Sequence, residues 1–239
     1  RPRGGRLRAG LGLAVAHRVA PELPAIHPLS ADGPEEDWAL LLSGLLVDGL
    51  ALHLDLPRYG AWLRRADRAP AYRLWARATR LLAGRLGGAL VLKDPQHLRA
   101  IPLLRAVAPD ARVVWTHRPP AAAVASAARL VAVQHRSLTG ALDLSRAGRR
   151  CLDRLADDLQ VAAPDAAVAH LPLAALRADP VDAVRSLCRA LDLAFDADAV
   201  ARAAAALPPP GPPAALAPTG LTPADIQAAV GDYRGAPLT

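Results

Sequence analysis

Residues 89–94 read Ala-Leu-Val-Leu-Lys-Asp, and residues 112–118 read Arg-Val-Val-Trp-Thr-His-Arg. Each is a short, continuous apolar run that ends in polar residues, which is typical of a buried strand. Residues 101–107 and 121–134, which follow the two runs, carry the apolar spacing of helices. Strand, helix, strand and helix in this order predict an α/β fold with a parallel sheet flanked by helices.

Helical patterns dominate the chain on both sides of this unit. A helix start at Gly33–Asp37 leads into apolar residues at helical spacing as far as Leu50, so one helix is expected over 38–50. Residues 167–173 could form a third strand. Further helices are expected at the start of the chain, around 59–63, and over 71–85, 142–161, 180–191, 196–207 and 222–230.

The length and composition suit one helix-rich globular domain. The chain has 239 residues, 52% of them hydrophobic and 3% aromatic. Alanine and leucine must therefore fill most of the core, which favours helices. No internal repeat or boundary divides the sequence, so residues 1–239 are expected to form a single domain, with residues 208–219 as a proline-rich loop within it.

The positive charge of the chain does not indicate nucleic-acid binding. The net charge is +7, but arginines are scattered and no basic stripe alternates with aromatic residues. A small anionic ligand suits this balance better. Lys93 is the one lysine among 29 basic residues. A compact ammonium group is not interchangeable with a guanidinium fork, so we expect Lys93 to be functional.

No metal site and no membrane span are expected. Cys151 and Cys188 lie far apart, without the spacing of metal ligands, and are expected to be free buried thiols. Free thiols fit a reducing, cytoplasmic compartment. The apolar run at the start is short for a signal peptide. The apolar stretch 38–56 is interrupted by charged and polar residues and does not read as a membrane span.

Two polar segments follow the two apolar runs. Ligands of open parallel sheets bind at the carboxyl ends of the strands. One segment contains Lys93 and His97, and the other contains Arg118, with Ser126 eight residues further on. Arg118, Ser126 and the N-terminus of the following helix could hold a phosphate.

These segments resemble motifs of a large group of bacterial sulfotransferases. Residues 90–98 resemble LKSPxHL, and residues 109–120, followed by Ser126, resemble PDARIVxTHRDP. Residues 27–36 resemble HPxGADLPEE. Shorter likenesses occur at 59–63 (YxxWL), 70–72 (PAY), 178–180 (ADP) and 191–193, so the resemblance extends over about residues 20–200.

The resemblance implies a P-loop-like fold and transfer of a sulfuryl group from 3′-phosphoadenosine 5′-phosphosulfate (PAPS) to a small-molecule alcohol, phenol or amine, without a metal. By position, Arg118 and Ser126 would bind the 3′-phosphate of the donor. Lys93 would lie near the sulfate, and His97 would be the general base. His27 and Glu35 are candidates on the acceptor side.

The sequence departs from the family pattern in the donor site. The family's first phosphate-binding loop, which resembles PRSGTT, would precede His27 by many tens of residues, whereas 26 residues precede it here. Asp94 replaces the usual serine and Pro119 the usual aspartate. The proline-rich run 208–213 lies where the family has a late basic segment. We therefore expect the first strand and loop to be missing.

Two functional interpretations follow. The chain is either an N-terminally truncated sulfotransferase or a non-catalytic relative that binds an anionic small molecule or a protein partner. The upstream coding sequence would distinguish them, because only a truncated enzyme should have a PRSGTT-like loop there. A nucleotide kinase is disfavoured because G-x-x-x-x-G-K-[ST] is absent.

Overall fold

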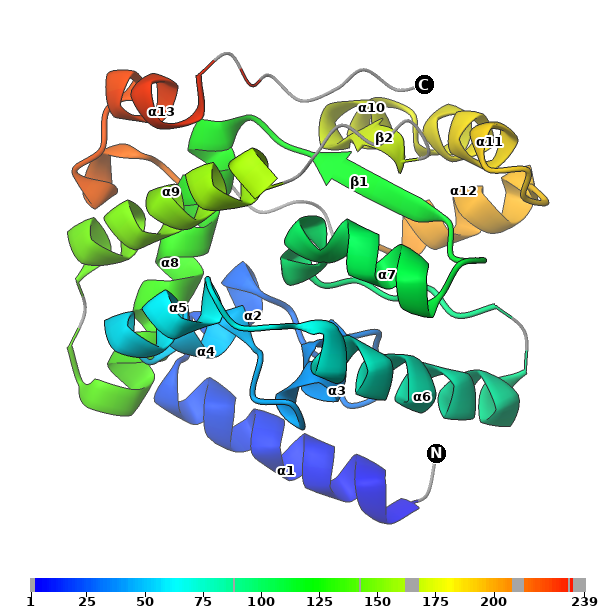
Figure 1. Cartoon of the computed structure of the whole chain (residues 1–239), viewed down its shortest axis with the longest axis horizontal. Helices are drawn as coiled ribbons and strands as arrows, with labels where there is room; N and C mark the ends of the chain where they lie inside the picture. Colours follow the sequence, from blue (N-terminus) through cyan, green and yellow to red (C-terminus); the bar gives the residue numbers. More distant parts are fainter. Residues whose placement is uncertain are drawn as a thin grey trace.

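The computed structural model describes residues 3–87, 89–141, 143–161, 168–207, 213–231 and 233. The part of the expected proline-rich loop at 208–212 lies outside these residues. The described chain is a helical molecule built around two parallel strands (Figure 1). No helix in the described ranges is long and apolar enough to cross a membrane.

The sheet consists of β1 (Val113–His117) and β2 (Val168–Pro172). The strands pair in parallel, with Val113 opposite Val168 and His117 opposite Pro172. β1 lies in the apolar run that predicts a strand, and β2 lies in residues 167–173, which were expected to be a possible third strand, so the structure confirms both. The register brings the two carboxyl ends together, so the segments that follow the strands start side by side.

The strand expected at residues 89–92, the first of the two apolar runs, is wrong. This segment pairs with neither strand of the described sheet, and the Val91 side chain is 97% exposed. A strand is stabilised by hydrogen bonds to a neighbouring strand, and the Leu-Val-Leu run finds no such neighbour here. The Lys93 carbonyl instead accepts a hydrogen bond from the Asp37 amide at 3.1 Å.

The helix expected over 38–50 is also wrong, because the chain forms two short helices there. They are α3 (Trp38–Leu42) and α4 (Asp48–His53). Between them, Leu45 has a φ of 52°. A Cβ at Gly44 would lie 2.7 Å from the Ala71 Cβ, so the chain approaches the neighbouring helix too closely for a larger residue. The turn places Leu46 and Val47 in the core.

The first part of the chain is helical and includes the elements near Lys93. The elements are α1 (Arg3–Val19), α2 (Leu23–Ile26), α5 (Pro57–Leu63), α6 (Ala69–Leu86), the 3-10 helix η1 (Pro95–Ala100) and α7 (Ile101–Val107). A core cluster that includes Leu41, Leu63, Tyr72 and Trp75 joins α3, α5 and α6 to α7. This cluster fixes the position of the site around Lys93 and His97.

A second core lies between α8 (Pro120–Thr139) and α9 (Leu144–Val161). The 3-10 helix η2 (Ala217–Thr219) and α13 (Pro223–Val230) pack on these helices. Gly148 of α9 faces Thr219 so closely that a Cβ at this position would lie 2.6 Å from the Thr219 Cβ. The small residue therefore permits the contact between α9 and η2.

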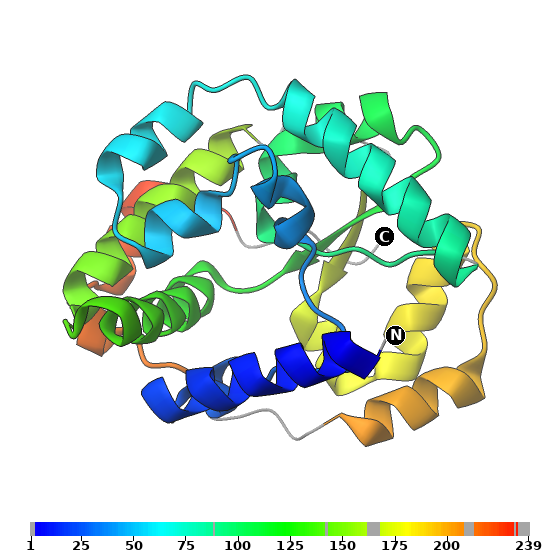
Figure 2. The same ribbon diagram turned by 90° about the horizontal axis from the view of Figure 1, so that it is seen from below.

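The helices α10 (Leu173–Ala178), α11 (Pro180–Ala190) and α12 (Ala197–Ala206) follow β2. Figures 1 and 2 show them together on one side of the molecule, beyond the sheet, with α8 and α9 on the other side. Both cysteines are free, as expected, but only Cys151 is buried, whereas Cys188 is partly exposed.

Candidate functional site

Two arginines follow the carboxyl ends of β1 and β2 in the chain. Arg118 directly follows β1, and Arg177 lies on α10, which begins directly after β2. Arg118 is half-buried, and burial lowers its pKa, with a further contribution from the positive charge of Arg177. In the part of the chain that the structure describes, neither arginine forms an ion pair with a carboxylate.

Ser126 lies on the helix that follows Arg118. It is the seventh residue of α8, in the second turn, and its side chain is half-buried. Pro119 precedes the helix and provides no side-chain cap, so the first amide groups of α8 have no partner from a capping residue. Arg118 and this helix terminus together provide positive charge at the sheet end.

Lys93 is highly exposed and forms an ion pair with Glu36. The two residues come from segments that lie side by side, because the Asp37 amide donates to the Lys93 carbonyl. Residues 35–37 read Glu-Glu-Asp, and Asp94 follows Lys93 directly. Lys93 therefore lies in acidic surroundings, in contrast to Arg118.

His97 is held by two hydrogen bonds. Its Nε2 lies 3.0 Å from Asp37 Oδ2, and its Nδ1 lies 2.9 Å from the Tyr72 hydroxyl. Trp75 Nε1 donates to the same Asp37 oxygen at 2.6 Å. The Asp37 side chain is 5% exposed, and Tyr72 and Trp75 are buried. His97 is therefore fixed in one orientation.

The electrostatics assign the protons of this group. Burial raises the pKa of Asp37, but hydrogen bonds from His97 and Trp75 outweigh it and hold the pKa below its usual range. Burial raises the pKa of Tyr72, so its hydroxyl keeps its proton. In the neutral form of His97, Nε2–H donates to the ionised Asp37, and Nδ1 then accepts from the Tyr72 hydroxyl. Both ring nitrogens have protein partners.

His27 and Glu35, the acceptor-side candidates, lie together. His27 Nε2 is 3.7 Å from Glu35 Oε1, and both side chains are partly exposed. Burial lowers the pKa of His53 to about 4. Glu36 and His27 make smaller contributions of opposite sign, so His53 lies near this segment. The structure thus brings the first segment of the resemblance, residues 27–36, close to Lys93.

The Asp94 side chain caps the 3-10 helix that follows it. Its carboxylate accepts hydrogen bonds from the Gln96 amide at 2.8 Å and from the Gln96 side chain at 3.2 Å, which caps η1. Burial raises the pKa of Asp94 to about 6. The acid at the family's serine position therefore has a structural role.

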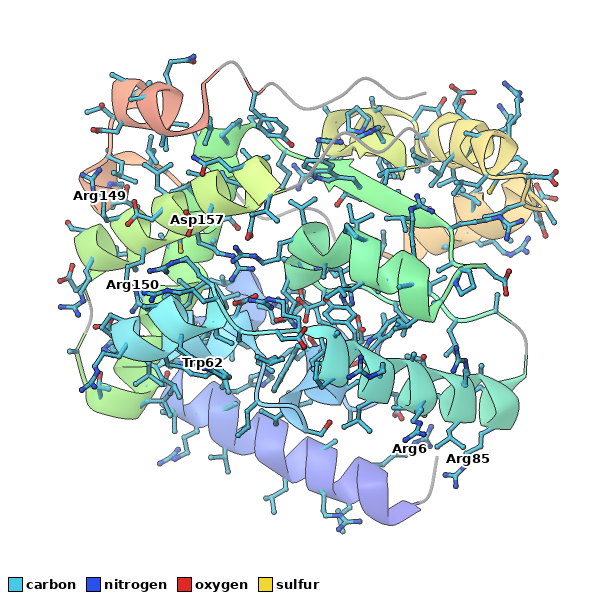
Figure 3. All side chains as sticks on the ribbon, viewed as in Figure 1. Arg6, Trp62, Arg85, Arg149, Arg150 and Asp157 are labelled. Carbon is cyan, nitrogen blue, oxygen red and sulfur yellow. The ribbon has the colours of Figure 1, made fainter. Side chains whose placement is uncertain are left out.

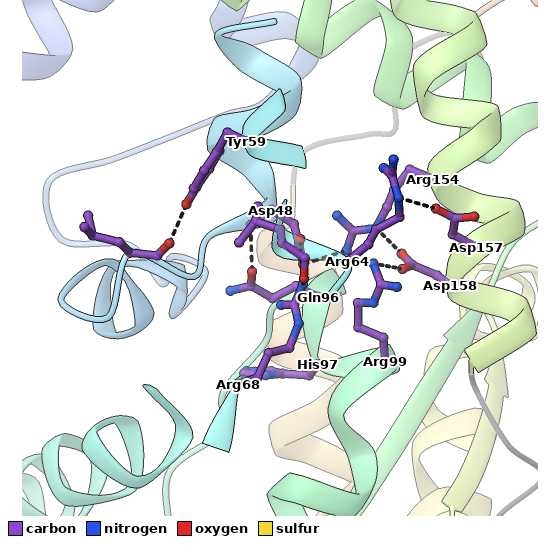
Figure 4. Close-up of polar contacts among 12 residues, drawn as sticks. Asp48, Tyr59, Arg64, Arg68, Gln96, His97, Arg99, Arg154, Asp157 and Asp158 are labelled. Atoms are coloured by element: carbon purple, nitrogen blue, oxygen red, sulfur yellow. Dashed lines mark hydrogen bonds and ion pairs between the residues drawn. The ribbon is translucent and has the colours of Figure 1, made fainter. Parts of the chain in front are cut away.

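A buried ionic network lies behind this site (Figure 4). Asp48 binds Arg68 at 2.8 Å and Arg154 at 3.2 Å, and its amide donates to the Gln96 side chain. Arg154 also binds Asp158 at 2.6 Å. Figure 4 shows that these contacts join α4, η1 and α9. The network fixes η1, the 3-10 helix that contains His97.

Two cavities lie among the described residues, and none of the predicted site residues lines either of them. One of about 460 Å³ between α4, α5 and α9 is lined by six arginines and four aspartates. Asp48, Asp55 and Asp157 form ion pairs with four arginines of this lining, and we assign these four a structural role. The other, of about 400 Å³, is lined largely by apolar residues near Trp62.

Basic side chains do not gather in one stripe on the described surface. Figure 3 shows Arg149 and Arg150 at one side of the molecule and Arg6 and Arg85 at another. The described residues contain no group of three or more side chains that could bind a metal ion.

The predicted site residues form two groups. Lys93, His97, His27 and Glu35 form one group, whereas Arg118 follows β1 directly and Ser126 lies on α8. No hydrogen bond or ion pair between described residues joins the groups. The sequence analysis did not identify Asp37, Tyr72 or Arg177 as site residues. In the sequence Asp37 is an acid in the first turn of an expected helix, and Tyr72 is part of a short motif. Arg177 has no feature that distinguishes it from the many other arginines.

The chain matches the model of the sulfotransferase family over residues 5–197. It is similar to the crystal structure of sulfotransferase STF9 from Mycobacterium avium, with a TM-score of 0.74 and 26% identity over 92% of this chain and 62% of that one. It is also similar to sulfotransferase STF1 from Mycobacterium tuberculosis, with a TM-score of 0.73 and 24% identity over 98% of this chain and 66% of that one. The chain thus spans less than two thirds of the length of either structure. No curated protein sequence matches it.

Proposed function

Because the chain belongs to the sulfotransferase family, we propose that it serves in sulfuryl transfer from PAPS to a hydroxyl or amine acceptor. The observation that carries this proposal is the half-buried Arg118 at the carboxyl end of β1, which has no carboxylate partner among the described residues. A cation held there without a counter-ion suits a bound phosphate. No metal is part of the proposal.

In this proposal Arg118 and Ser126 bind the 3′-phosphate of the donor. The guanidinium of Arg118 supplies paired hydrogen bonds, and the N-terminus of α8 adds its dipole. Ser126 supplies one neutral hydrogen bond and contributes less. Arg118→Ala should therefore abolish measurable nucleotide binding, whereas Ser126→Ala should weaken it by about threefold to tenfold.

Lys93 serves the transfer step. The S–O bond to the donor phosphate breaks as a bond forms to the acceptor oxygen or nitrogen, and adenosine 3′,5′-bisphosphate leaves. Lys93 neutralises charge that develops on the leaving phosphate. It must exchange Glu36 for the donor to do so. Lys93→Ala should therefore slow turnover more than it weakens nucleotide binding.

His97 as the general base stays a prediction. A base must offer a lone pair to the acceptor proton. In neutral His97 the Nδ1 lone pair accepts a hydrogen bond from the Tyr72 hydroxyl. His97 therefore acts as a base only when Tyr72 turns away. Asp37 would then stabilise the imidazolium that forms.

A transfer assay tests this function. The chain is incubated with sulfur-35-labelled PAPS and a panel of phenols, alcohols and amines, and labelled product is measured. Product that is lost in Lys93→Ala and Arg118→Ala, but retained in the exposed Arg189→Ala control, supports the proposal. A chain that binds nucleotide and yields no labelled product with any acceptor contradicts it.

The alternative is a non-catalytic module that binds an anionic small molecule or a protein. The ion pair between Lys93 and Glu36 favours it, because the ammonium group is already neutralised. Free cysteines fit the proposed cytoplasmic location, which cell fractionation would check. We also propose a single domain, which predicts one cooperative unfolding transition.

A further inference from the structure

We propose that Arg177 is a second ligand of the anion at Arg118, so that each of the two neighbouring strand ends supplies one arginine. The proposal rests on the proposed function, in which the anion is the 3′-phosphate of PAPS. It adds a binding residue that lies almost sixty positions from Arg118 in the sequence.

The backbone places both arginines at one edge of the sheet. His117 is the Cα partner of Pro172 in the parallel ladder. Arg118 follows His117, and α10 begins at Leu173, directly after Pro172. The chain segments that leave the two strands therefore start as neighbours, about 4.8 Å apart in an ordinary sheet.

The helix geometry directs Arg177 back to this edge. Arg177 lies four residues after Leu173, one turn further on the same face of α10. Side chains in a helix tilt toward its N-terminus. The N-terminus of α10 is the end that adjoins β2, so a long side chain at position 177 can reach the strand ends and Arg118.

The charges indicate a ligand between the two arginines. Burial lowers the pKa of Arg118, and the positive charge of the exposed Arg177 acts in the same direction. No carboxylate of the described residues pairs with either guanidinium. Two like charges that are held close without a counter-ion repel each other. A doubly charged phosphate removes the repulsion and accepts hydrogen bonds from both groups.

The test compares the full chain with Arg177→Ala and with Arg202→Ala, an exposed arginine of α12 that serves as the control. Adenosine 3′,5′-bisphosphate is titrated by calorimetry, and inorganic phosphate is titrated by phosphorus NMR. Arg177→Ala should weaken both ligands by about tenfold or more, whereas Arg202→Ala should change neither. Arg177→Lys should keep part of the affinity, because it keeps the charge without the fork.

A stability measurement separates this role from a structural one. Removal of Arg177 relieves repulsion and breaks no ion pair of the described residues, so the melting temperature of the free chain should stay the same or rise. A fall in both melting temperature and affinity would indicate a structural residue and overturn the proposal.

The outcomes distinguish this inference from the proposed function. If the nucleotide binds in an Arg118-dependent manner and Arg177→Ala binds it equally well, the role of Arg177 is wrong and the proposed function stands. If phosphate binds through Arg177 but the nucleotide does not bind, the anion site is supported and the PAPS assignment is wrong. If a folded chain binds neither ligand, both are wrong.

Discussion

His97 illustrates how neighbouring residues decide what a motif residue can do. Its place in the sequence suggests a base at the end of a strand. The structure instead gives it two buried partners, Asp37 and Tyr72, which come from segments 60 and 25 positions away. A base role and a positioning role then differ in one feature, which is whether Nδ1 becomes free.

We expect His97→Asn to destabilise the chain. The substitution removes the hydrogen bonds to Asp37 and Tyr72 and leaves these buried groups with fewer partners, which should lower the free energy of unfolding by about 1–3 kcal/mol. Lys93→Ala, at an exposed position, should change it by less than about 0.5 kcal/mol. Urea unfolding of both variants checks this, and an unchanged midpoint for His97→Asn would contradict the assigned contacts.

Acid should destabilise the chain through its buried histidines. Burial lowers the pKa of His117 from 6.5 to about 4, with a contribution from His170. His53 behaves alike. The folded state then binds fewer protons than the unfolded state between these values, so stability falls as the pH drops from 6.5 to 4. The raised pKa of Asp94 acts in the opposite direction.

Urea midpoints at pH 7 and pH 5 test this pH dependence. The midpoint should be lower at pH 5, and the difference should shrink in His117→Asn. A midpoint that rises on acidification would mean that Asp94 outweighs the two histidines.

Two glycines in different helices should respond in opposite ways to substitution by alanine. A Cβ at Gly148 would lie 2.6 Å from Thr219, whereas a Cβ at Gly84 of α6 meets no atom within 4 Å. Gly148→Ala should lower the free energy of unfolding by about 1–3 kcal/mol through overpacking. Gly84→Ala should raise it by about 0.5–1 kcal/mol through helix propensity. Thermal unfolding checks both, and equal shifts would contradict the close packing of α9 on η2.

The elements that the sequence predicted best carry local signals. The threonine and proline at 222–223 start α13 with a capping box, and the apolar run of residues 113–115 lies in β1. The failures have non-local causes. The break near Leu45 depends on the close approach of Gly44 to Ala71, and the extended run around Val91 needs a neighbouring strand. Neither condition can be read from the segment itself.

The whole molecule separates two kinds of site residue. Each basic residue of one group has a carboxylate partner: Glu36 for Lys93, Asp37 for His97 and Glu35 for His27. Arg118 and Arg177, by contrast, follow the two strand ends. The sequence motifs identified most of these residues but not their partners, because Asp37, Tyr72 and Arg177 meet them only after folding. The resemblance gave the family, and the family model confirms it over residues 5–197.

The most direct test of the account is a calorimetric titration of the folded chain with adenosine 3′,5′-bisphosphate, repeated with Arg118→Ala. We expect binding in the micromolar range that is lost in the variant, while both proteins unfold at similar temperatures. Binding that persists unchanged in Arg118→Ala would place the nucleotide elsewhere. No binding by the folded wild-type chain would contradict the donor site at the strand ends.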